Sequence, residues 1–203
     1  MTDRTPNWSK AEIVSRDTST QWLTDSEILN QLNLVGDTSQ ITMLREYDLV
    51  VRTYIEEYLG SAVFAQTWTG WYRLDSTAPA PFYLDLPTTP RPVSTAVTIN
   101  TVKAYTAASG LVTLDSSLYT YDSTGNRVVL NSVPALSDTV ANPVVVTFTL
   151  AQSPLATNPA VLHAGKMLLT HLYNNRDTHS EKVQNEVPMG FSALLRPYKP
   201  LVM

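Results

Sequence analysis

The sequence pattern changes twice along the chain, and the long stretch between the two changes constrains the fold most. Between Ser61 and Pro159, Thr, Val, Tyr and Ser dominate, prolines are frequent, and no helical period continues. Alternating runs such as LYTYD and NRVVLN are separated by turn sequences such as STGN and SVPALSD. This stretch predicts about seven short antiparallel strands. The STGN turn predicts a positive φ at Gly125 or Asn126.

Helical patterns lie on both sides of this stretch. WLTDSEILNQLNL predicts a first helix that begins with a capping box formed by Thr24 and Glu27. A second helix is expected from about Thr38 to Leu59. A third is expected from about Ala160 to Asn174, with Pro159 near its first turn.

The second helix has two apolar stripes, followed by a stop signal at Gly60. The first stripe contains Ile41, Leu44, Val51, Ile55 and Tyr58. The second stripe contains Met43, Tyr47, Val50 and Tyr54. A surface helix needs only one apolar stripe. The second stripe therefore indicates either a helix enclosed within its own domain or a helix that contacts a neighbouring subunit.

Charge is sparse in the β-rich stretch. Between Ser76 and Leu162 the charged residues are Asp85, Arg91, Lys103, Asp115, Asp122, Arg127 and Asp138. A sheet with few charges and many hydroxyls can pack against neighbours without the desolvation of many ions. A β-sandwich with a hydroxyl-rich surface explains the same composition equally well.

Both ends of the chain fall outside these patterns. Residues 1–22 are polar, without a sustained period, and are expected to form an extended arm in which Trp22 is the first anchor.

The tail after Val187 is rich in large apolar side chains and its only charges are basic. The candidate anchoring residues in this tail are Phe191, Leu194, Leu195, Arg196, Tyr198 and Lys199. We expect the tail to leave its subunit and bind a partner with an acidic groove, with residues 174–186 as a tether. The alternative is that it folds back over the third helix.

These boundaries predict an α+β protein. Its expected core is a helical bundle of two N-terminal helices and one C-terminal helix, with a large antiparallel β insertion and an extended C-terminal tail. The expected parts are an arm (1–22), N-terminal helices (23–60), a β-rich region (61–159), a C-terminal helix (160–177), and a tether with an anchoring tail (178–203).

Composition excludes several function classes. The net charge of −4 argues against a protein held on nucleic acid mainly by a basic surface. The chain has no cysteine, which excludes disulfides and thiolate chemistry. The N-terminus lacks the apolar run of a signal peptide, and no stretch approaches the roughly 20 apolar residues of a membrane span. A cytoplasm-like compartment is therefore expected.

No catalytic, cofactor-binding or metal-binding residues are predicted. Eight residues separate His163 from His171, which turns them about 80° apart on a helix, so they are poor co-ligands. The Asp122-Ser-Thr-Gly125 run has one residue more than the Asp-Thr-Gly of aspartic proteases and is better interpreted as a turn. No phosphate loop or dinucleotide fingerprint occurs.

The order of these segments resembles the head-tail connector (adaptor) family of tailed bacteriophages. The resemblance rests on VVRTYIEEYLG at the end of the second helix, HLYNNRD in the third, and VPMGFSALLRPYKP at the C-terminus. The arm and the β-rich region are longer here than in the common pattern. The resemblance implies a structural protein of the virion neck, assembled in the bacterial host cytoplasm. It implies a ring, typically of twelve copies, that binds the portal protein and head-closure or tail proteins and forms part of the DNA channel.

Some residue patterns agree with that implication. In residues 24–59 acids outnumber bases by seven to two, which suits a channel through which DNA slides; a solvated helix surface explains the acids equally well. Two rival hypotheses stay open: another neck or tail component, such as a head-closure or tail-completion protein, and a small β-rich hydrolase that uses acids such as Asp115 and Asp122.

Overall fold

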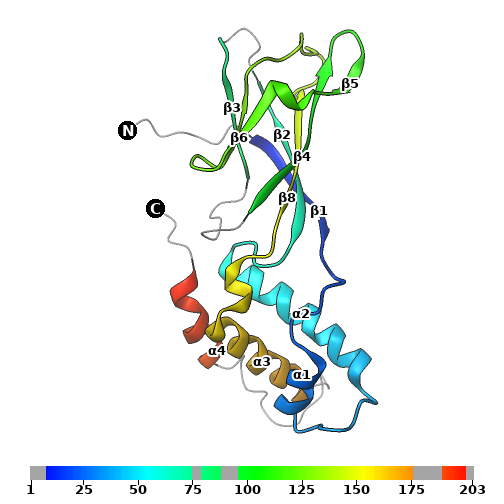
Figure 1. Ribbon diagram of the computed structural model, residues 1–203, viewed down its shortest axis with the longest axis vertical. Coiled ribbons are helices and arrows are strands. Elements are labelled where there is room, and N and C mark those ends of the chain that lie inside the picture. The colour runs from blue at the N-terminus through cyan, green and yellow to red at the C-terminus, as the bar shows by residue number, and fades with distance from the viewer. Residues whose placement is uncertain (1–7, 75–78, 88–95, 176–188, 200–203) are drawn as a thin grey trace. The chain divides into compact units, whose positions relative to one another are not determined.

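The computed structural model describes residues 8–74, 79–87, 96–175 and 189–199, and its contacts divide the chain into two compact units. The β unit contains Met1–Arg16, Ala65–Thr89 and Ala96–Ala151. The helical unit contains Asp17–Phe64, Pro90–Thr95 and Gln152–Met203. Helices and antiparallel sheets both occur, so the α+β class is confirmed (Figure 1).

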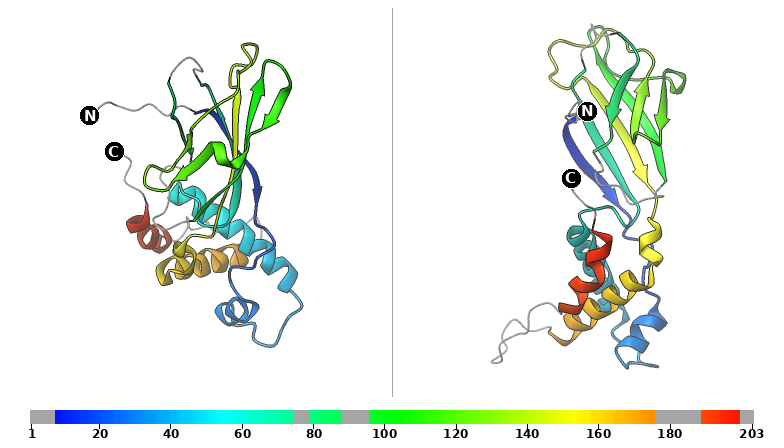
Figure 2. Two further views of the ribbon diagram at one scale, coloured as in Figure 1. Left: turned by 45° about the horizontal axis from the view of Figure 1, so that its top comes forward. Right: turned by 90° about the vertical axis from the view of Figure 1, so that its left-hand side faces the viewer.

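The β unit consists of two antiparallel sheets (Figure 2). The five-stranded sheet has the order β1 (Trp8–Arg16), β2 (Gln66–Tyr72), β8 (Val144–Leu150), β4 (Val97–Thr106), β5 (Gly110–Thr113). The three-stranded sheet has the order β3 (Phe82–Asp85), β7 (Arg127–Leu130), β6 (Tyr119–Asp122), and the 3₁₀ turn η1 (Ser116–Leu118) precedes β6. The seven strands β2 to β8 confirm the predicted run, and Asn126 takes the expected positive φ of 49°.

Alternation along the strands builds the core of the β unit. On β8, Val146 and Phe148 are completely buried, while Thr147 and Thr149 lie on the opposite face, because successive strand residues point to opposite sides. From the smaller sheet, Leu84 is also fully buried. Both sheets therefore contribute side chains to this core.

The N-terminal segment differs from the expected extended arm. Trp8–Arg16 forms β1, which pairs antiparallel with β2 from Trp8 opposite Tyr72 to Arg16 opposite Gln66. Trp8, Ala11 and Ile13 are its partly buried residues, and the other residues of the strand are exposed. An edge strand of this kind carries only a weak apolar alternation, which is why the sequence pattern did not reveal it.

The helical unit contains α1 (Asp25–Gln31), α2 (Ile41–Leu59), α3 (Pro159–Asn174) and α4 (Met189–Leu195). Two 3₁₀ turns, η2 (Pro154–Thr157) and η3 (Arg196–Tyr198), precede α3 and follow α4. The capping box of Thr24 and Glu27 is present, and Gly60 ends α2 in a left-handed conformation with φ of 64°. The first three helices and these end signals confirm the sequence predictions.

The fourth helix was not expected. Within α4, Phe191 and Leu195 are fully buried and belong to the same apolar core as Leu44 and Ile55 of α2 and Leu169 of α3. The described part of the predicted extended tail therefore folds onto its own unit, as the alternative interpretation proposed. The segments 176–188 and 200–203, with most of the predicted tether, lie outside the described residues.

Candidate functional site

The structure divides the second apolar stripe of α2 between the core and the surface. Met43 and Tyr47 are partly buried and pack against the helical core. Val50 is 52% exposed and Tyr54 is 39% exposed. Only the C-terminal half of the stripe is thus available to a partner.

The aromatic residues at the end of α2 hold the C-terminal helix. The Phe191 ring lies between those of Tyr54 and Tyr58, with its centroid 5.5 Å from each in edge-to-face contacts. The Tyr58 hydroxyl donates a hydrogen bond to the Ser192 carbonyl at 3.2 Å. Tyr54 therefore has one side against the core and another at the surface.

The six candidate anchoring residues of the tail also divide. Phe191 and Leu195 are buried in the helical core, so in this arrangement neither is available to a partner. Leu194 and Tyr198 are partly buried against that core. Arg196 and Lys199 are exposed, and the Lys199 ammonium lies 4.9 Å from the centre of the Tyr58 ring. The described end of the chain thus presents a basic surface next to α2.

Three charged residues on α2 that the sequence did not single out are buried: Asp48, Arg52 and Glu56. They recur every four residues and therefore share one side of the helix. Arg52 donates hydrogen bonds to the carbonyls of Asp17 and Thr20, and Glu56 accepts two backbone N–H groups at the other end of the row. The spacing of four residues was the one sequence signal that these three side chains share a helix face. A row of mixed charges on a helix is more often solvated than buried, so the burial was not predicted.

Asp48 is the least well satisfied of the three. Its Oδ2 accepts the backbone N–H of Trp22 at 3.2 Å, whereas its Oδ1 is buried and has no hydrogen-bond partner. Burial raises the pKa of Asp48 above its ordinary value, against the opposing effects of the Trp22 N–H and the Arg52 charge. Burial of this carboxylate therefore lowers the stability of the fold, and the group is not accessible to a ligand.

The surplus of acids in residues 24–59 is smaller at the surface than in the sequence. Asp48 and Glu56 are buried, Asp25 is paired with Arg45 at 2.7 Å, and Glu27 is paired with Lys166 at 2.9 Å. The remaining acids of the segment are all exposed: Asp37, Glu46 and Glu57. Few acids of residues 24–59 are therefore candidates for the channel lining that the resemblance implies.

The outward face of the five-stranded sheet is rich in hydroxyls that bond to one another. Thr67 and Thr149 share a hydrogen bond of 3.1 Å between their side chains, and so do Thr69 and Thr147. Asn100 donates to Thr149 at 2.9 Å. Because these hydroxyl groups already have hydrogen-bond partners, a neighbouring protein could cover the face without leaving them unsatisfied. This agrees with the sparse charge noted from the sequence.

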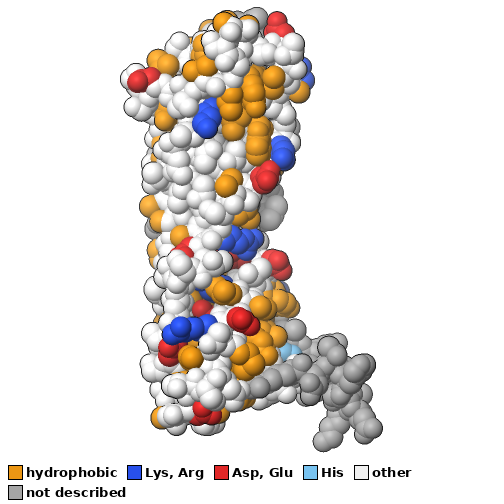
Figure 3. Space-filling view, turned by 90° about the vertical axis from the view of Figure 1, so that its right-hand side faces the viewer, with side chains coloured by type: hydrophobic (Ala, Val, Ile, Leu, Met, Phe, Trp, Pro, Cys, Tyr) orange, Lys and Arg blue, Asp and Glu red, His pale blue; other side chains and the backbone are white. Residues whose placement is uncertain are grey.

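The β5 edge of the same sheet also exposes apolar side chains. Leu111 is 46% exposed and Val112 is 37% exposed. The space-filling view in Figure 3 shows apolar side chains in patches, with Lys, Arg, Asp and Glu side chains scattered between them. Exposed apolar groups on β5 and α2 are therefore surfaces suited to contacts with other proteins.

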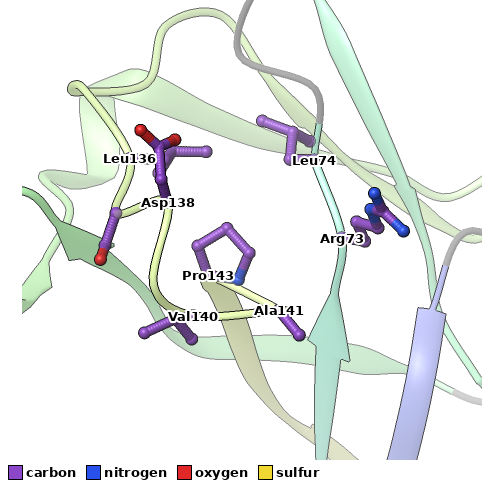
Figure 4. Close-up of a pocket in the computed structure, with 8 residues that line it drawn as sticks. Arg73, Leu74, Leu136, Asp138, Val140, Ala141 and Pro143 are labelled. Carbon is purple, nitrogen blue, oxygen red and sulfur yellow. The ribbon is translucent and has the colours of Figure 1, made fainter.

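A pocket of about 320 Å³ lies in the β unit between the end of β2 and the segment before β8. Figure 4 shows Arg73 and Leu74 on one side and Leu136 and Asp138 on the other, with Pro143 between them. Arg73 and Asp138 are exposed, Asp138 supplies the one carboxyl group of this lining, and the Ser137 hydroxyl shares a hydrogen bond with Thr139 at 2.8 Å. The pocket offers no set of residues for a reaction.

The two acids of the hydrolase hypothesis have local roles. Asp115 accepts the Ser117 N–H at 2.9 Å, and these backbone and side-chain hydrogen bonds with Ser117 lower its pKa. Asp122 holds the turn to β7: hydrogen bonds from Thr124 lower its pKa most, and Arg127 at 2.9 Å lowers it further. A carboxyl held ionised in this way is a poor general acid at neutral pH.

Within the described ranges there is no group of three or more His, Asp or Glu side chains that could hold a metal ion. None of the helices described is both long and apolar enough to cross a membrane.

The amino-acid sequence matches no protein-family model and no curated protein. Solved structures do match, over nearly the whole chain. The fold is that of a chain in the neck of a gene transfer agent (GTA) particle. Against the neck of the native particle, computed with C12 symmetry, the identity is 16% and the TM-score 0.59, covering 96% of this chain and 97% of the other. The neck of the empty particle, computed with C6 symmetry, gives 15% identity and a TM-score of 0.60 with the same coverage. A chain of the native virion gives 14% and 0.57.

Proposed function

We propose that this protein is a structural component of the neck of a phage-like virion. The observation that carries the proposal is the match of the fold over 96% of this chain and 97% of a chain from a GTA neck. Coverage of both chains from end to end means that the β unit and the helical unit occur together in that structure too. The order of motifs that resembles head-tail connectors supports the same role independently of the fold.

In the finer form of the proposal, the protein forms a ring of twelve copies that joins the portal of the DNA-filled head to the tail. The use of C12 and C6 symmetry for the two GTA necks supports a ring. Head-to-tail contacts between identical subunits close into a ring when the rotation permits. The DNA passes through without sequence recognition, as the net charge of −4 favours. Assembly takes place in the bacterial host cytoplasm.

Two surfaces of the helical unit are assigned to contacts in this proposal. Val50 and Tyr54 contact the neighbouring subunit, because they are the exposed part of the second stripe. The basic end of the chain, with Arg196 and Lys199, faces an acidic surface of the portal. Phe191 and Leu195 contribute indirectly, because they hold α4 in place under that basic surface.

The first test is Val50→Asp. Val50 is 52% exposed, so an aspartate there leaves the monomer folded, whereas the same charge buried between subunits weakens each contact by about 2–5 kcal/mol. We expect native mass spectrometry to detect monomers of the variant at concentrations where the wild-type chain forms rings. Thr53→Asp, at an exposed position off the stripe, serves as the matched control. If Val50→Asp forms rings of unchanged stability, the stripe is not part of the subunit interface.

The decisive test of the function is electron microscopy of the purified chain, alone and with portal-containing heads. We expect rings that add to the portal vertex. A chain that stays monomeric in both settings would contradict the connector role. A ring that binds tails but never heads would instead favour a tail-completion role.

A further inference from the structure

Among the described residues, three segments of the helical unit at which the chain passes to or from the β unit meet beside α2. The first contains Asp17 and Thr20, the second Val63 and Phe64, and the third Ser153. They are far apart in the sequence, yet all three are tied by hydrogen bonds to α2 or to one another. We refer to them as the three passages.

Arg52 holds the first passage. Its Nη1 donates to the Thr20 carbonyl at 2.7 Å and its Nη2 donates to the Asp17 carbonyl at 2.6 Å. The guanidinium carbon also lies 4.3 Å from the centre of the Phe64 ring, which belongs to the second passage. One buried side chain therefore contacts two passages.

Glu56 holds the second passage, and through it the third. Its Oε1 accepts the backbone N–H groups of both Val63 and Phe64, each at 2.8 Å. The Val63 carbonyl then accepts the Ser153 N–H at 2.8 Å. A single carboxylate oxygen thus fixes the segment to which the third passage is bonded.

These two charged side chains are nearly as buried as the apolar core, with Arg52 5% and Glu56 8% exposed. Packing alone would be served at least as well by apolar residues, because burial of a charge is unfavourable unless several hydrogen bonds compensate it. The charged groups add specificity, because each one forms hydrogen bonds with particular backbone groups of the passages. We propose that Arg52 and Glu56 form a buried latch that fixes the three passages, and that the closed latch is required for subunits to assemble.

The link to assembly rests on the proposed ring and on the position of the latch within α2. Arg52 and Glu56 alternate along the same two turns with Val50 and Tyr54, which point to the surface. A shift of these turns therefore moves the proposed subunit contact and the passages together. Arg52 and Glu56 are positioning residues, since neither side chain is exposed enough to contact a neighbour.

The test compares Glu56→Leu with Glu56→Gln in the full chain. Gln keeps an oxygen that can accept both N–H groups, whereas Leu keeps only similar bulk. Glu57→Gln, on the exposed side of the same turn, is the control. Hydrogen exchange of the Val63 and Phe64 amides reports the latch, and native mass spectrometry reports the ring.

We expect exchange at Val63 and Phe64 to be about tenfold faster or more in Glu56→Leu and near the wild-type rate in Glu56→Gln. Rings should be lost in the Leu variant alone. If Glu56→Leu does not fold, Arg52→Lys decides, because one ammonium cannot reproduce the two-pronged contact with the Asp17 and Thr20 carbonyls. It should release the first passage and weaken the ring in a folded monomer.

Rings of normal stability in a folded variant with released passages would overturn the latch and leave the proposed function standing. Unchanged amide exchange in Glu56→Leu would overturn it as well. Absence of rings from the wild-type chain would instead overturn the proposed function, and with it the role of the latch in assembly.

Discussion

At the scale of single residues, the side chain of Trp22 makes three close contacts at once. Its indole N–H donates to the Ala156 carbonyl at 2.7 Å, and its ring meets Phe64 edge to face at 5.2 Å. The ring also lies directly on Gly165 of α3, where an added Cβ would come within 2.3 Å of it. The anchoring role predicted for Trp22 is confirmed, and it depends on the missing side chain at Gly165.

Gly165→Ala should therefore destabilise the protein, although Ala is normally the better helix residue by about 1 kcal/mol. The rigid indole is fixed by its hydrogen bond and has little room to retreat, so overpacking of about 1–3 kcal/mol outweighs that gain. Urea denaturation measures the difference. In a Trp22→Ala background the same substitution should become neutral or stabilising, and a loss of equal size there would contradict the packing explanation.

Asp48→Asn should become increasingly favourable as the pH rises. The raised pKa of Asp48 means that the folded protein holds this proton more tightly than the unfolded chain, whose Asp has a pKa near 3.8. The favourable contribution is therefore complete below that value and is lost as the pH rises through the raised pKa. Asn stays neutral and its oxygen can still accept the Trp22 N–H. We expect the stability of the variant relative to wild type to increase from about pH 4 to about pH 7; a constant difference would contradict the burial argument.

At the scale of elements, α4 is a short helix whose stability comes from the helical core. A seven-residue helix is marginal by itself, so its contacts with α2 and α3 must hold it. Phe191 supplies the central contact, between the rings of Tyr54 and Tyr58. The C-terminal segment is thus part of the domain that the rest of the helical unit forms.

Phe191→Ala should lower the free energy of unfolding by about 3–5 kcal/mol, as expected for an aromatic side chain removed from a core. The exposed Arg196→Ala provides the control for a change at the same end of the chain. Removal of all residues after Val187 should produce at least the same loss in a thermal melt. A truncated protein with an unchanged midpoint would mean that α4 contributes nothing to the monomer.

Elements with strong local signals could be predicted from the sequence, and those defined by distant partners could not. The capping box of α1, the glycine stop of α2 and the STGN turn between β6 and β7 are local and were predicted correctly. β1 is an edge strand whose identity depends on pairing with β2, and α4 offers only the short set Phe191, Leu194 and Leu195 at helical spacing as a signal. In the sequence, the row Asp48, Arg52, Glu56 resembles a solvated helix face. Only the folded structure shows that the passages cover it. The predicted interface and anchoring residues stay predictions.

At the scale of the whole molecule, β1 determines what the edge of the larger sheet exposes. β1 carries charged residues and two register irregularities, features that discourage pairing between molecules at a sheet edge. β2, which it covers, has the sequence QTWTGWY and no charged residue. β1 therefore covers an uncharged, aromatic-rich strand whose edge would otherwise be exposed along its length.

Deletion of residues 1–16 should therefore convert most of the purified protein into aggregates, because β2 becomes an uncharged edge strand. Deletion of residues 1–7 alone keeps β1 and should leave the elution volume in size-exclusion chromatography unchanged. A soluble monomer from the longer deletion would show that the edge of β2 is protected by other means.

Apart from the short segment Pro90–Thr95 of the helical unit, the chain passes from the β unit to the helical unit, back to the β unit and again to the helical unit. This order governs how the protein can fold while the ribosome is making it. β1 leaves the ribosome first, but its partner β2 begins only at Gln66, and α1 and α2 are made before either unit has its other parts. The larger sheet closes when β8 ends at Leu150, and the helical core closes only when α4 ends at Leu195. Late closure of both units keeps β1 and the apolar stripes of α2 exposed on nascent chains, which favours slow maturation and dependence on chaperones. Chains that enter the proposed ring should accordingly have been made at least to the end of α4, since no shorter product contains the complete helical core.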